Sequence, residues 1–171
     1  MRIAVLNKTV LFSLLSLLML TLAPLAQADG LTDFNGNPEK IDNHTGKDKW
    51  TVIMFWASDC HVCNAEAHEY VAFQKKHKDG NIRMLGITLD GKANIEAARE
   101  FVKEHKLNFT NLVGEPETIG SLYYEMTGNF FVGTPTFMIL SPDNKVKAAD
   151  AGAIPPKIIE DFISEQSVAA N

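Results

Sequence analysis

The chain has 171 residues, 46% of them hydrophobic and 22% charged, and its formal net charge is -5. It is acidic and contains no basic run long enough to follow a phosphate backbone, which argues against nucleic acid as a partner. Beyond the first 28 residues about 140 remain, enough for one domain with a substantial core.

The first 28 residues have the build of a secretory signal. Arg2 and Lys8 precede an apolar run, and the segment ends in the small-residue pattern Ala-Gln-Ala at 26–28. A membrane-spanning anchor would need about 20 apolar residues, whereas this run is broken by Pro24. We therefore expect export to the periplasm and cleavage after Ala28, with a membrane anchor as the alternative if the segment is retained. Disulfides form and persist in such a compartment.

Beyond residue 28, segments of strand and helix type alternate. Residues 29–49 are polar and rich in Gly, Asn and Asp, which predicts an irregular segment or a weak hairpin. The segments WTVIMFWA at 50–57 and IRMLGITLD at 82–90 are apolar almost throughout, as in strands covered on both faces. The other predicted elements are helices at 61–78, 95–105, 117–126 and 155–165 and extended segments at 109–113, 136–140 and 145–149.

We expect Asn94 to cap the second of these helices. Strands that alternate with helices of this length predict one α/β domain, residues 29–171, with helices on both faces of a sheet.

The two cysteines of the chain, Cys60 and Cys63, stand two residues apart between the first apolar strand and the first helix. At the start of a helix, unpaired N–H groups and the helix dipole favour an anion, so this position favours the Cys60 thiolate, the nucleophilic form of cysteine. Cys63 lies one turn further in and is expected to be more covered. This asymmetry suits a redox pair in which Cys60 attacks and Cys63 resolves.

Such a pair can also serve as a structural disulfide, a haem attachment or part of a metal site. A structural disulfide across so few residues would remove loop entropy worth only about 2 kcal/mol. Covalent haem requires a His directly after the second Cys, where this chain has Asn64. A metal site would have to recruit His61 or His68, and His68 lies about 140° around the helix from Cys63. Copper is the least implausible metal.

Two further segments are expected to join the cysteines. Glu66 follows Cys63 by three residues on the same helix face, where a carboxyl can exchange a proton with the Cys63 thiol; the alternative is an ordinary solvated acid. Pro135 stands directly before an apolar strand, where a cis bond would mark a tight turn, although trans is the default for Thr134–Pro135. The remaining histidines, in polar surroundings, are predicted to face solvent: His44, His77 and His105.

These motifs resemble those of thioredoxin-fold proteins, and among them the exported TlpA/ResA-like thiol–disulfide oxidoreductases. The similar segments are VIMFWASDCHVC with the Glu66 that follows, ITLD, and GTPTFMILSPDNKV. FNGNPEKIDNHTGKDKW is similar to the family's N-terminal extension, and residues 107–126 to its central insertion. The resemblance covers nearly the whole chain after residue 28. It implies a thioredoxin-like α/β fold, with a central mixed sheet and helices on both faces.

The resemblance also implies roles for individual residues. Cys60 attacks, Cys63 resolves, and Glu66 handles the proton of the buried thiol, in place of the buried Asp that ordinary thioredoxins have where this chain has Met54. Pro135 is cis and lies against the disulfide. The implied substrate-binding residues are Trp56, Thr134 and Pro135.

The chain departs from the family beside the cysteines, where Asp59 and Val62 replace the usual Trp and Pro. A carboxylate at position 59 would disfavour the Cys60 thiolate, whereas a protonated His61 would favour it, so the two effects oppose. Thr134 before the proline is similar to disulfide isomerases and some oxidases, which leaves the redox direction open.

We therefore predict an exported thiol–disulfide oxidoreductase that reduces disulfides of exported proteins through its dithiol and needs no cofactor. The resemblance implies a membrane thiol electron donor of the DsbD type as a partner. The alternatives are a disulfide oxidase or isomerase, and a copper metallochaperone that uses Cys60, Cys63 and a histidine.

Overall fold

The computed structural model describes residues 30–169, so the predicted signal segment lies outside the described residues. The elements in chain order are β1 (Leu31–Thr32), β2 (Pro38–Glu39), the short 3-10 helix η1 (Ile41–Asn43), β3 (Trp50–Trp56), α2 (His61–Lys76), β4 (Ile82–Thr88), α3 (Ile95–Glu104), β5 (Thr110–Val113), α4 (Pro116–Thr127), β6 (Thr136–Leu140), β7 (Val146–Ala151) and α5 (Pro156–Ala169).

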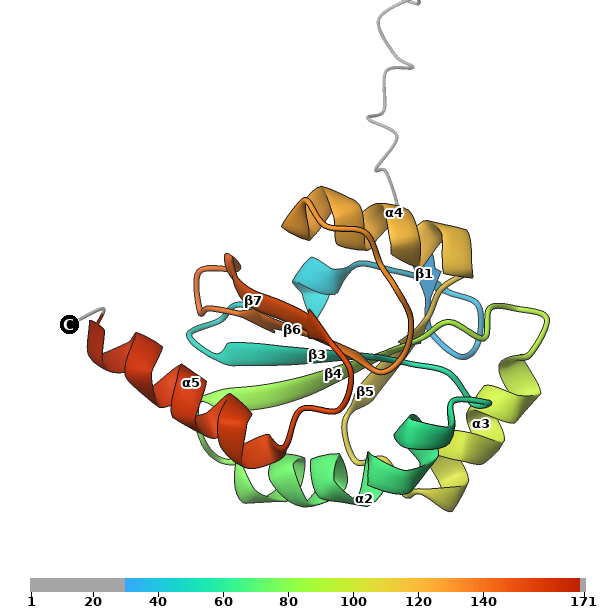
Figure 1. Ribbon diagram of the computed structural model, residues 1–171. Helices are drawn as coiled ribbons and strands as arrows, with labels where there is room; N and C mark the ends of the chain where they lie inside the picture. The colour runs from blue at the N-terminus through green and yellow to red at the C-terminus, as the bar shows by residue number, and fades with distance from the viewer. Residues whose placement is uncertain (1–29, 170–171) are drawn as a thin grey trace, which may run out of the picture.

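One seven-stranded sheet, in the order β2-β1-β5-β4-β3-β6-β7, runs through the molecule. β3, β4 and β5 are parallel and are joined by the crossover helices α2 and α3. β6 and β7 continue the sheet antiparallel to β3, and β1 pairs antiparallel with β5. Helices α2, α3 and α5 cover one face and α4 covers the other (Figure 1). The predicted mixed sheet with helices on both faces is confirmed.

β3 shows how an unbroken apolar run builds two cores. All seven of its residues are buried, and successive side chains point to opposite faces of a sheet. Val52, Met54 and Trp56 belong to the core under α2, α3 and α5, whereas Ile53 and Phe55 belong to the core under α4. The strand is apolar at every position because neither of its faces meets water.

The polar N-terminal segment adds two very short strands to the sheet. β1 and β2 form the weak hairpin that the composition suggested, and Leu31 of β1 is fully buried in the core under α4. The pairing of β1 with β5 was not predicted, because a strand of two residues has no readable period. β5 and α4 occupy the segment predicted as a central insertion.

Helix ends differ in detail from the prediction. Asn94 is the N-cap residue of α3, but its side chain makes no capping hydrogen bond, so the predicted cap is wrong in its chemistry. α5 continues four residues beyond the predicted end at 165. Within residues 30–169, none of the helices combines the length and apolar character needed to cross a bilayer.

The strand directions bring three elements to one edge of the sheet. β3 and β4 are parallel and end together, with Trp56 paired to Thr88. β6 runs the opposite way and begins there, since Phe55 pairs with Thr136. The chain that leads into α2, the chain after β4 and the chain that enters β6 therefore meet at this edge, where both cysteines lie.

Candidate active site

Cys60 and Cys63 form a disulfide at the start of α2, with their Cα atoms 5.2 Å apart. Cys60 is the N-cap residue of the helix, and its Sγ accepts a hydrogen bond of 3.1 Å from the backbone N–H of Cys63. The N-terminal end of a helix carries partial positive charge. This geometry favours negative charge on the Cys60 sulfur when the disulfide is opened.

The two sulfur atoms differ in access. Cys63 is fully buried and belongs to the core under α2, whereas Cys60 is half-buried at the rim of that core. Asp59 and His61 are exposed on either side of Cys60, and Val62 is 39% exposed. A partner can therefore reach Cys60 while Cys63 stays covered, which is the arrangement required for an attacking and a resolving thiol.

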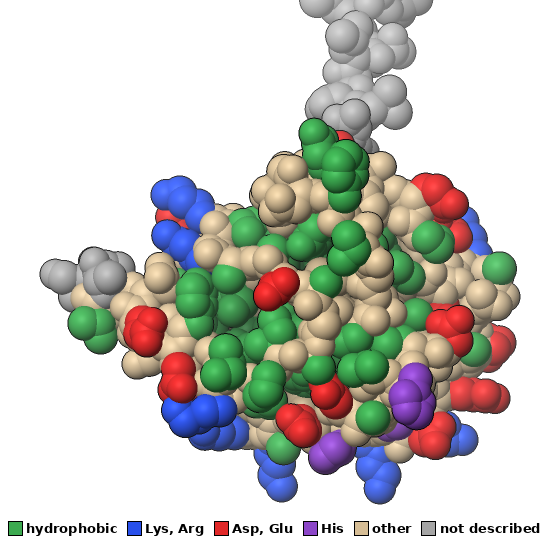
Figure 2. Space-filling model, in the orientation of Figure 1, with side chains coloured by type: hydrophobic (Ala, Val, Ile, Leu, Met, Phe, Trp, Pro, Cys, Tyr) green, Lys and Arg blue, Asp and Glu red, His purple; other side chains and the backbone are tan. Residues whose placement is uncertain are grey.

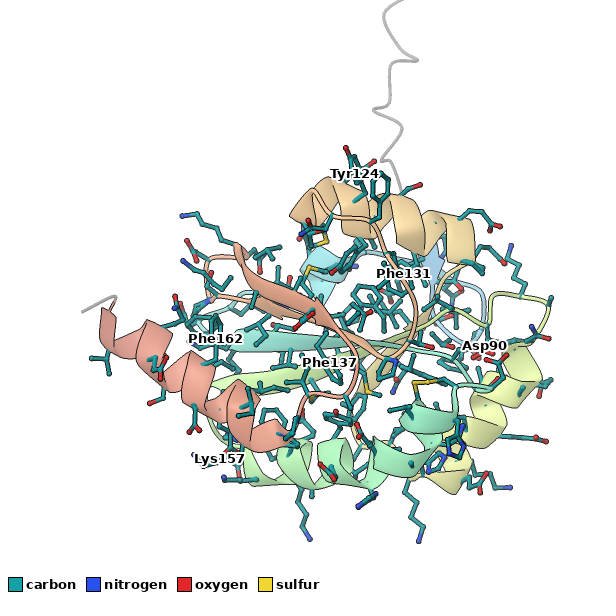
Figure 3. The ribbon with its side chains drawn as sticks, viewed as in Figure 1. Asp90, Tyr124, Phe131, Phe137, Lys157 and Phe162 are labelled. Carbon is teal, nitrogen blue, oxygen red and sulfur yellow. A yellow bond between two sulfur atoms is a disulfide. The ribbon has the colours of Figure 1, made fainter. Side chains whose placement is uncertain are left out.

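The loop that carries Cys60 is tied to Asp90, the second residue after β4. The Asp90 carboxylate accepts hydrogen bonds from the backbone N–H of Ser58 at 3.0 Å and from its hydroxyl at 2.6 Å. Thr88 also donates its hydroxyl to Asp90, which is buried. Figure 3 shows Asp90 beside the disulfide at this edge of the sheet. In the sequence, Asp90 stands out only as the end of a predicted strand. Ser58 follows one apolar strand and Asp90 follows the next, and if the two strands are parallel neighbours their ends lie close together, which could have indicated this contact.

Asn64 closes the other side of the loop. Its Nδ2 donates to the carbonyl oxygens of Ser58 at 3.0 Å and Cys60 at 2.9 Å, so its Oδ1 is left to accept. His105 Nε2 lies 3.0 Å from that Oδ1 and therefore donates to it. The His105 ring also packs on Phe101, with ring centroids 4.4 Å apart. His105 is half-buried and supports the site, and the prediction that it faces solvent is wrong.

The same correction applies to two other histidines. His44 Nε2 lies 3.0 Å from Glu39, and His77 Nε2 lies 2.8 Å from Glu160 on α5. Both imidazoles are largely covered, at 23% and 18% side-chain exposure. Glu160 is 83 residues from His77 along the chain, so local composition could not reveal it.

Glu66 is half-buried, one turn after Cys63 on α2. The hydroxyl of Tyr70 lies 3.3 Å from Glu66 Oε2 and 3.1 Å from the carbonyl oxygen of Ile154. Burial, and then the negative charge of Glu66, raise the pKa of Tyr70 well above its ordinary value. The sequence predicted no role for Tyr70; its spacing of four residues from Glu66 on one helix is the signal for this contact.

Thr134 and Pro135 lie at the same edge of the sheet, directly before β6. The Thr134–Pro135 peptide bond is cis, Pro135 is buried and Thr134 is half-buried. The carbonyl oxygen of Pro135 accepts a hydrogen bond of 2.8 Å from the N–H of Gly152, in the segment between β7 and α5. Among the predicted site residues, Cys60, Cys63, Thr134 and Pro135 are thus gathered at one edge, with Glu66 one helical turn behind.

Trp56 does not belong to a substrate-binding surface. Its side chain has no exposed area, stacks on Phe101 with centroids 4.3 Å apart, and donates from Nε1 to Asn111 at 3.0 Å. A Cβ at Gly86 would lie 1.8 Å from that Asn111 oxygen, so the glycine makes room for the pair. The role predicted for Trp56 is wrong because β3 is covered on both faces up to its last residue.

Met54, which the resemblance places where ordinary thioredoxins have a buried acid, is 2% exposed in the core that contains Cys63. Within residues 30–169, no three His, Cys, Asp or Glu side chains gather in a group that could hold a metal ion. His68 is exposed and its Nδ1 contacts the carbonyl oxygen of Ala65 on its own helix.

A model of the AhpC/TSA family matches residues 22–149 of the chain. Among curated proteins, sporulation thiol-disulfide oxidoreductase A of Bacillus subtilis (strain 168) is 20% identical over 120 residues, which cover 70% of this chain and 69% of that protein. Among solved structures, a secreted Mycobacterium tuberculosis disulfide oxidoreductase homologous to E. coli DsbE has a TM-score of 0.60 and 23% identity, covering 78% of this chain and 92% of its own.

A further solved structure, a thiol:disulfide interchange protein of the thioredoxin family from Chlorobium tepidum TLS, has a TM-score of 0.64 and 18% identity, covering 78% of this chain and 89% of its own. These likenesses confirm the predicted thioredoxin-like fold. The family match spans most of the chain, and the chain has a Cys60–Cys63 disulfide at a helix start. Both observations identify its family. The chain belongs to the AhpC/TSA family, as a thioredoxin-like protein of the thiol–disulfide oxidoreductase type.

Proposed function

We propose that this protein is an exported reductase of disulfides in other exported proteins. In this proposal residues 1–28 are a secretory signal and residues 29–171 form the working domain in the periplasm. The observation that carries it is the asymmetry of the pair, in which half-buried Cys60 accepts the Cys63 N–H while Cys63 is fully buried. The family match and its oxidoreductase relatives support the same chemistry.

The reduced protein acts in two exchange steps. The Cys60 thiolate attacks one sulfur of the target disulfide, which forms a mixed disulfide and releases the other target sulfur as a thiolate. The Cys63 thiol then loses its proton and attacks Cys60, which releases the second target sulfur. The target disulfide gains two electrons and becomes a dithiol, while the Cys60–Cys63 pair loses two electrons and becomes the disulfide seen here.

Two neighbouring groups assist these steps in the proposal. Glu66, one turn from Cys63 and half-buried, accepts the Cys63 proton before the second attack. The Thr134–Pro135 segment, at the same sheet edge as Cys60, contacts the target chain around its cysteine. On the face seen in Figure 2, apolar side chains gather over the middle, with an acidic side chain among them, and the Lys and Arg side chains lie toward the rim. An apolar centre suits contact with a protein.

An electron donor must reopen the disulfide after each cycle, because the periplasm does not reduce it. We propose a membrane thiol carrier of the DsbD type, which would attack the accessible Cys60 sulfur. The copper metallochaperone gains no support from the described residues, since no third ligand joins the cysteines there.

A trapping experiment tests the roles of the two cysteines. Cys63→Ser is expected to accumulate mixed disulfides with exported proteins, because attack proceeds and release does not. Cys60→Ser is expected to trap nothing and to lose reductase activity. Mixed disulfides are detected on non-reducing gels and identified by mass spectrometry. A Cys60→Ser protein that keeps its reductase activity would contradict the proposal.

The reduction potential of the pair tests the direction of electron flow. It is measured by equilibrating the domain with glutathione or dithiothreitol buffers. A value near or below that of thioredoxin, about -270 mV, supports a reductase. A value near that of DsbA, about -120 mV, would reverse the direction and make the protein an oxidant, the role that Thr134 before the proline also fits.

A further inference from the structure

The hydroxyl of Tyr70 lies between two acceptors that belong to different parts of the site. One is Glu66 Oε2 at 3.3 Å, on the same helix, and the other is the carbonyl oxygen of Ile154 at 3.1 Å, in the segment between β7 and α5. Tyr70 is 1% exposed, and its ring packs on Phe137 of β6 with centroids 4.9 Å apart. The ring is therefore held in place, and only the direction of the O–H bond is free to change.

Counting protons shows that the two contacts depend on each other. A tyrosine hydroxyl has one proton to donate, and a carbonyl oxygen can only accept. If Glu66 is protonated, it donates to Tyr70, and Tyr70 donates to Ile154. If Glu66 is ionised, both neighbours are acceptors, and the carboxylate attracts the hydroxyl proton more strongly than the neutral carbonyl does. Ionisation of Glu66 thus takes the Tyr70 donor away from Ile154.

The segment that contains Ile154 is hydrogen-bonded to Pro135, the residue before β6. Gly152, two residues before Ile154, donates its N–H to the carbonyl oxygen of Pro135 at 2.8 Å. Ile154 also packs against the core that contains Cys63 and Tyr70. A change in the hydrogen bond at Ile154 therefore acts on a short segment that is itself bonded to Pro135.

We propose that Tyr70 is a positioning residue that links the protonation state of Glu66 to the 152–154 segment and, through it, to Pro135. The inference deepens the proposed function and rests on it, because Glu66 must be the group that takes the Cys63 proton. When Cys63 gives its proton to Glu66 and attacks Cys60, Tyr70 turns its hydroxyl toward Ile154. The segment that holds the target chain is thereby altered in the same step that releases the target.

Few other charged side chains lie close to Tyr70 and the 152–154 segment. The carboxylates whose negative charges act on Tyr70 are Glu66 and Glu69, both on α2. β6, whose Phe137 packs on Tyr70, and the segment 152–156, which contains Ile154, have no ionisable side chain. Lys157, the next residue of α5, is paired with Asp161. Within residues 30–169, Glu66 itself forms no ion pair with Lys, Arg or His.

The test uses reduced protein and a chromogenic aryl disulfide as the target, so that each exchange step releases one coloured thiolate. The first release reports attack by Cys60 and the second reports displacement by Cys63. The rate of the second step is followed against pH in the wild type, Tyr70→Phe, Glu66→Gln and the double variant. Tyr123→Phe, which removes a hydroxyl from a buried tyrosine in the opposite core, is the matched control.

Tyr70→Phe is expected to shift the second-step profile toward higher pH, because the Glu66 carboxylate loses a hydrogen-bond donor. The shift should vanish when Glu66→Gln is already present, and Tyr123→Phe should leave the profile in place. A Tyr70→Phe shift that persists in the Glu66→Gln background would overturn the inference and make Tyr70 a packing residue only.

A second readout does not depend on the Tyr70 variant. The amide signal of Gly152, followed by NMR in the reduced wild type, is expected to titrate with pH and to become flat in Glu66→Gln. A Gly152 signal that titrates equally in both proteins would contradict the link.

The proposed function fails separately from the inference. If Glu66→Gln leaves the second-step profile unchanged, Glu66 does not take the Cys63 proton, and both the proposed role of Glu66 and the inference fall. If Glu66→Gln changes the profile and Tyr70→Phe does not, the role of Glu66 stands and the inference alone is wrong.

Discussion

Asp90 is the side chain that shapes the approach to Cys60. It accepts hydrogen bonds from both the backbone N–H and the hydroxyl of Ser58, and a further one from the Thr88 hydroxyl. A buried carboxylate with several donors is stable only while those donors are present, and the donors in turn lose their partner if the carboxylate is removed. The loop 57–59 is therefore held on one side by Asp90, which follows β4, and on the other by Asn64.

Asp90→Ala is expected to lower the free energy of unfolding by about 1–3 kcal/mol, because it leaves Ser58 and Thr88 donors without an acceptor. It should also slow attack by Cys60, since the loop before that residue is no longer fixed. Urea denaturation followed by circular dichroism measures the first effect and the aryl disulfide assay measures the second. Asp79→Ala, at an exposed position after α2, is the control; an equal loss in both variants would contradict a specific role for Asp90.

The sequence predicts the chemistry of single residues better than their contacts. Cys60 and Cys63 were predictable because a short spacing at a helix start is visible in the order of residues. Asn64 and His105 were not, since their contact joins residues 41 positions apart. The role predicted for Trp56 was wrong because the sequence does not distinguish an aromatic residue that lines a binding surface from one that fills a core.

At the scale of elements, α2 and α5 are joined by a charged contact at the far end of α2 from the cysteines. Both carboxylate oxygens of Glu160 lie 2.8 Å from Lys76 Nζ, and Oε1 is also 2.8 Å from His77 Nε2. These donors, Lys76 first, lower the pKa of Glu160 below its ordinary value of 4.5. A carboxyl with a lowered folded-state pKa stabilises the protein above its unfolded pKa, and this contribution is lost as the pH falls.

Glu160→Gln is therefore expected to destabilise the protein at pH 7 by up to about 1 kcal/mol, the usual range for partly exposed pairs. The difference from wild type should shrink as the pH falls from about 5 to 3, when the wild-type carboxyl becomes protonated. Urea denaturation at pH 7, 5 and 3 measures it, with exposed Glu165→Gln on the same helix as the control. A difference that is constant across this range would show that the contact acts through packing.

The elements themselves followed from apolar patterns of sufficient length. β6 was predicted with its observed bounds, since TFMIL is a compact apolar run after a proline. β1 was not predicted to pair with β5, although Leu31 is fully buried, because one apolar residue in a polar segment carries no period. Tertiary pairing decides the structure of such short segments.

At the scale of the whole molecule, stability comes from two cores separated by the sheet, and the disulfide spans only three residue positions. A crosslink this short restricts the unfolded chain little, by about 2 kcal/mol in the loop-entropy account. Opening the disulfide therefore should not open the fold, which a protein that cycles between two redox states requires.

The oxidised and reduced proteins are expected to differ in free energy of unfolding by about 2 kcal/mol or less. Urea denaturation with and without dithiothreitol measures the difference, and the Cys60→Ser/Cys63→Ser variant, which the reductant cannot change, is the control. A reduced protein that is unfolded in the absence of urea would contradict this account, because the disulfide would then be supporting the fold.

The division into two cores also determines which part of the protein its intrinsic tryptophan fluorescence reports on. The chain has two tryptophans, Trp50 and Trp56, and both lie in the core that contains Cys63, at 5% and 0% exposure. The core under α4 contains neither. Intrinsic tryptophan fluorescence therefore samples the redox side of the sheet and is blind to rearrangements on the other side. Opening the Cys60–Cys63 disulfide is therefore expected to change the tryptophan emission, without a dye attached near Cys60.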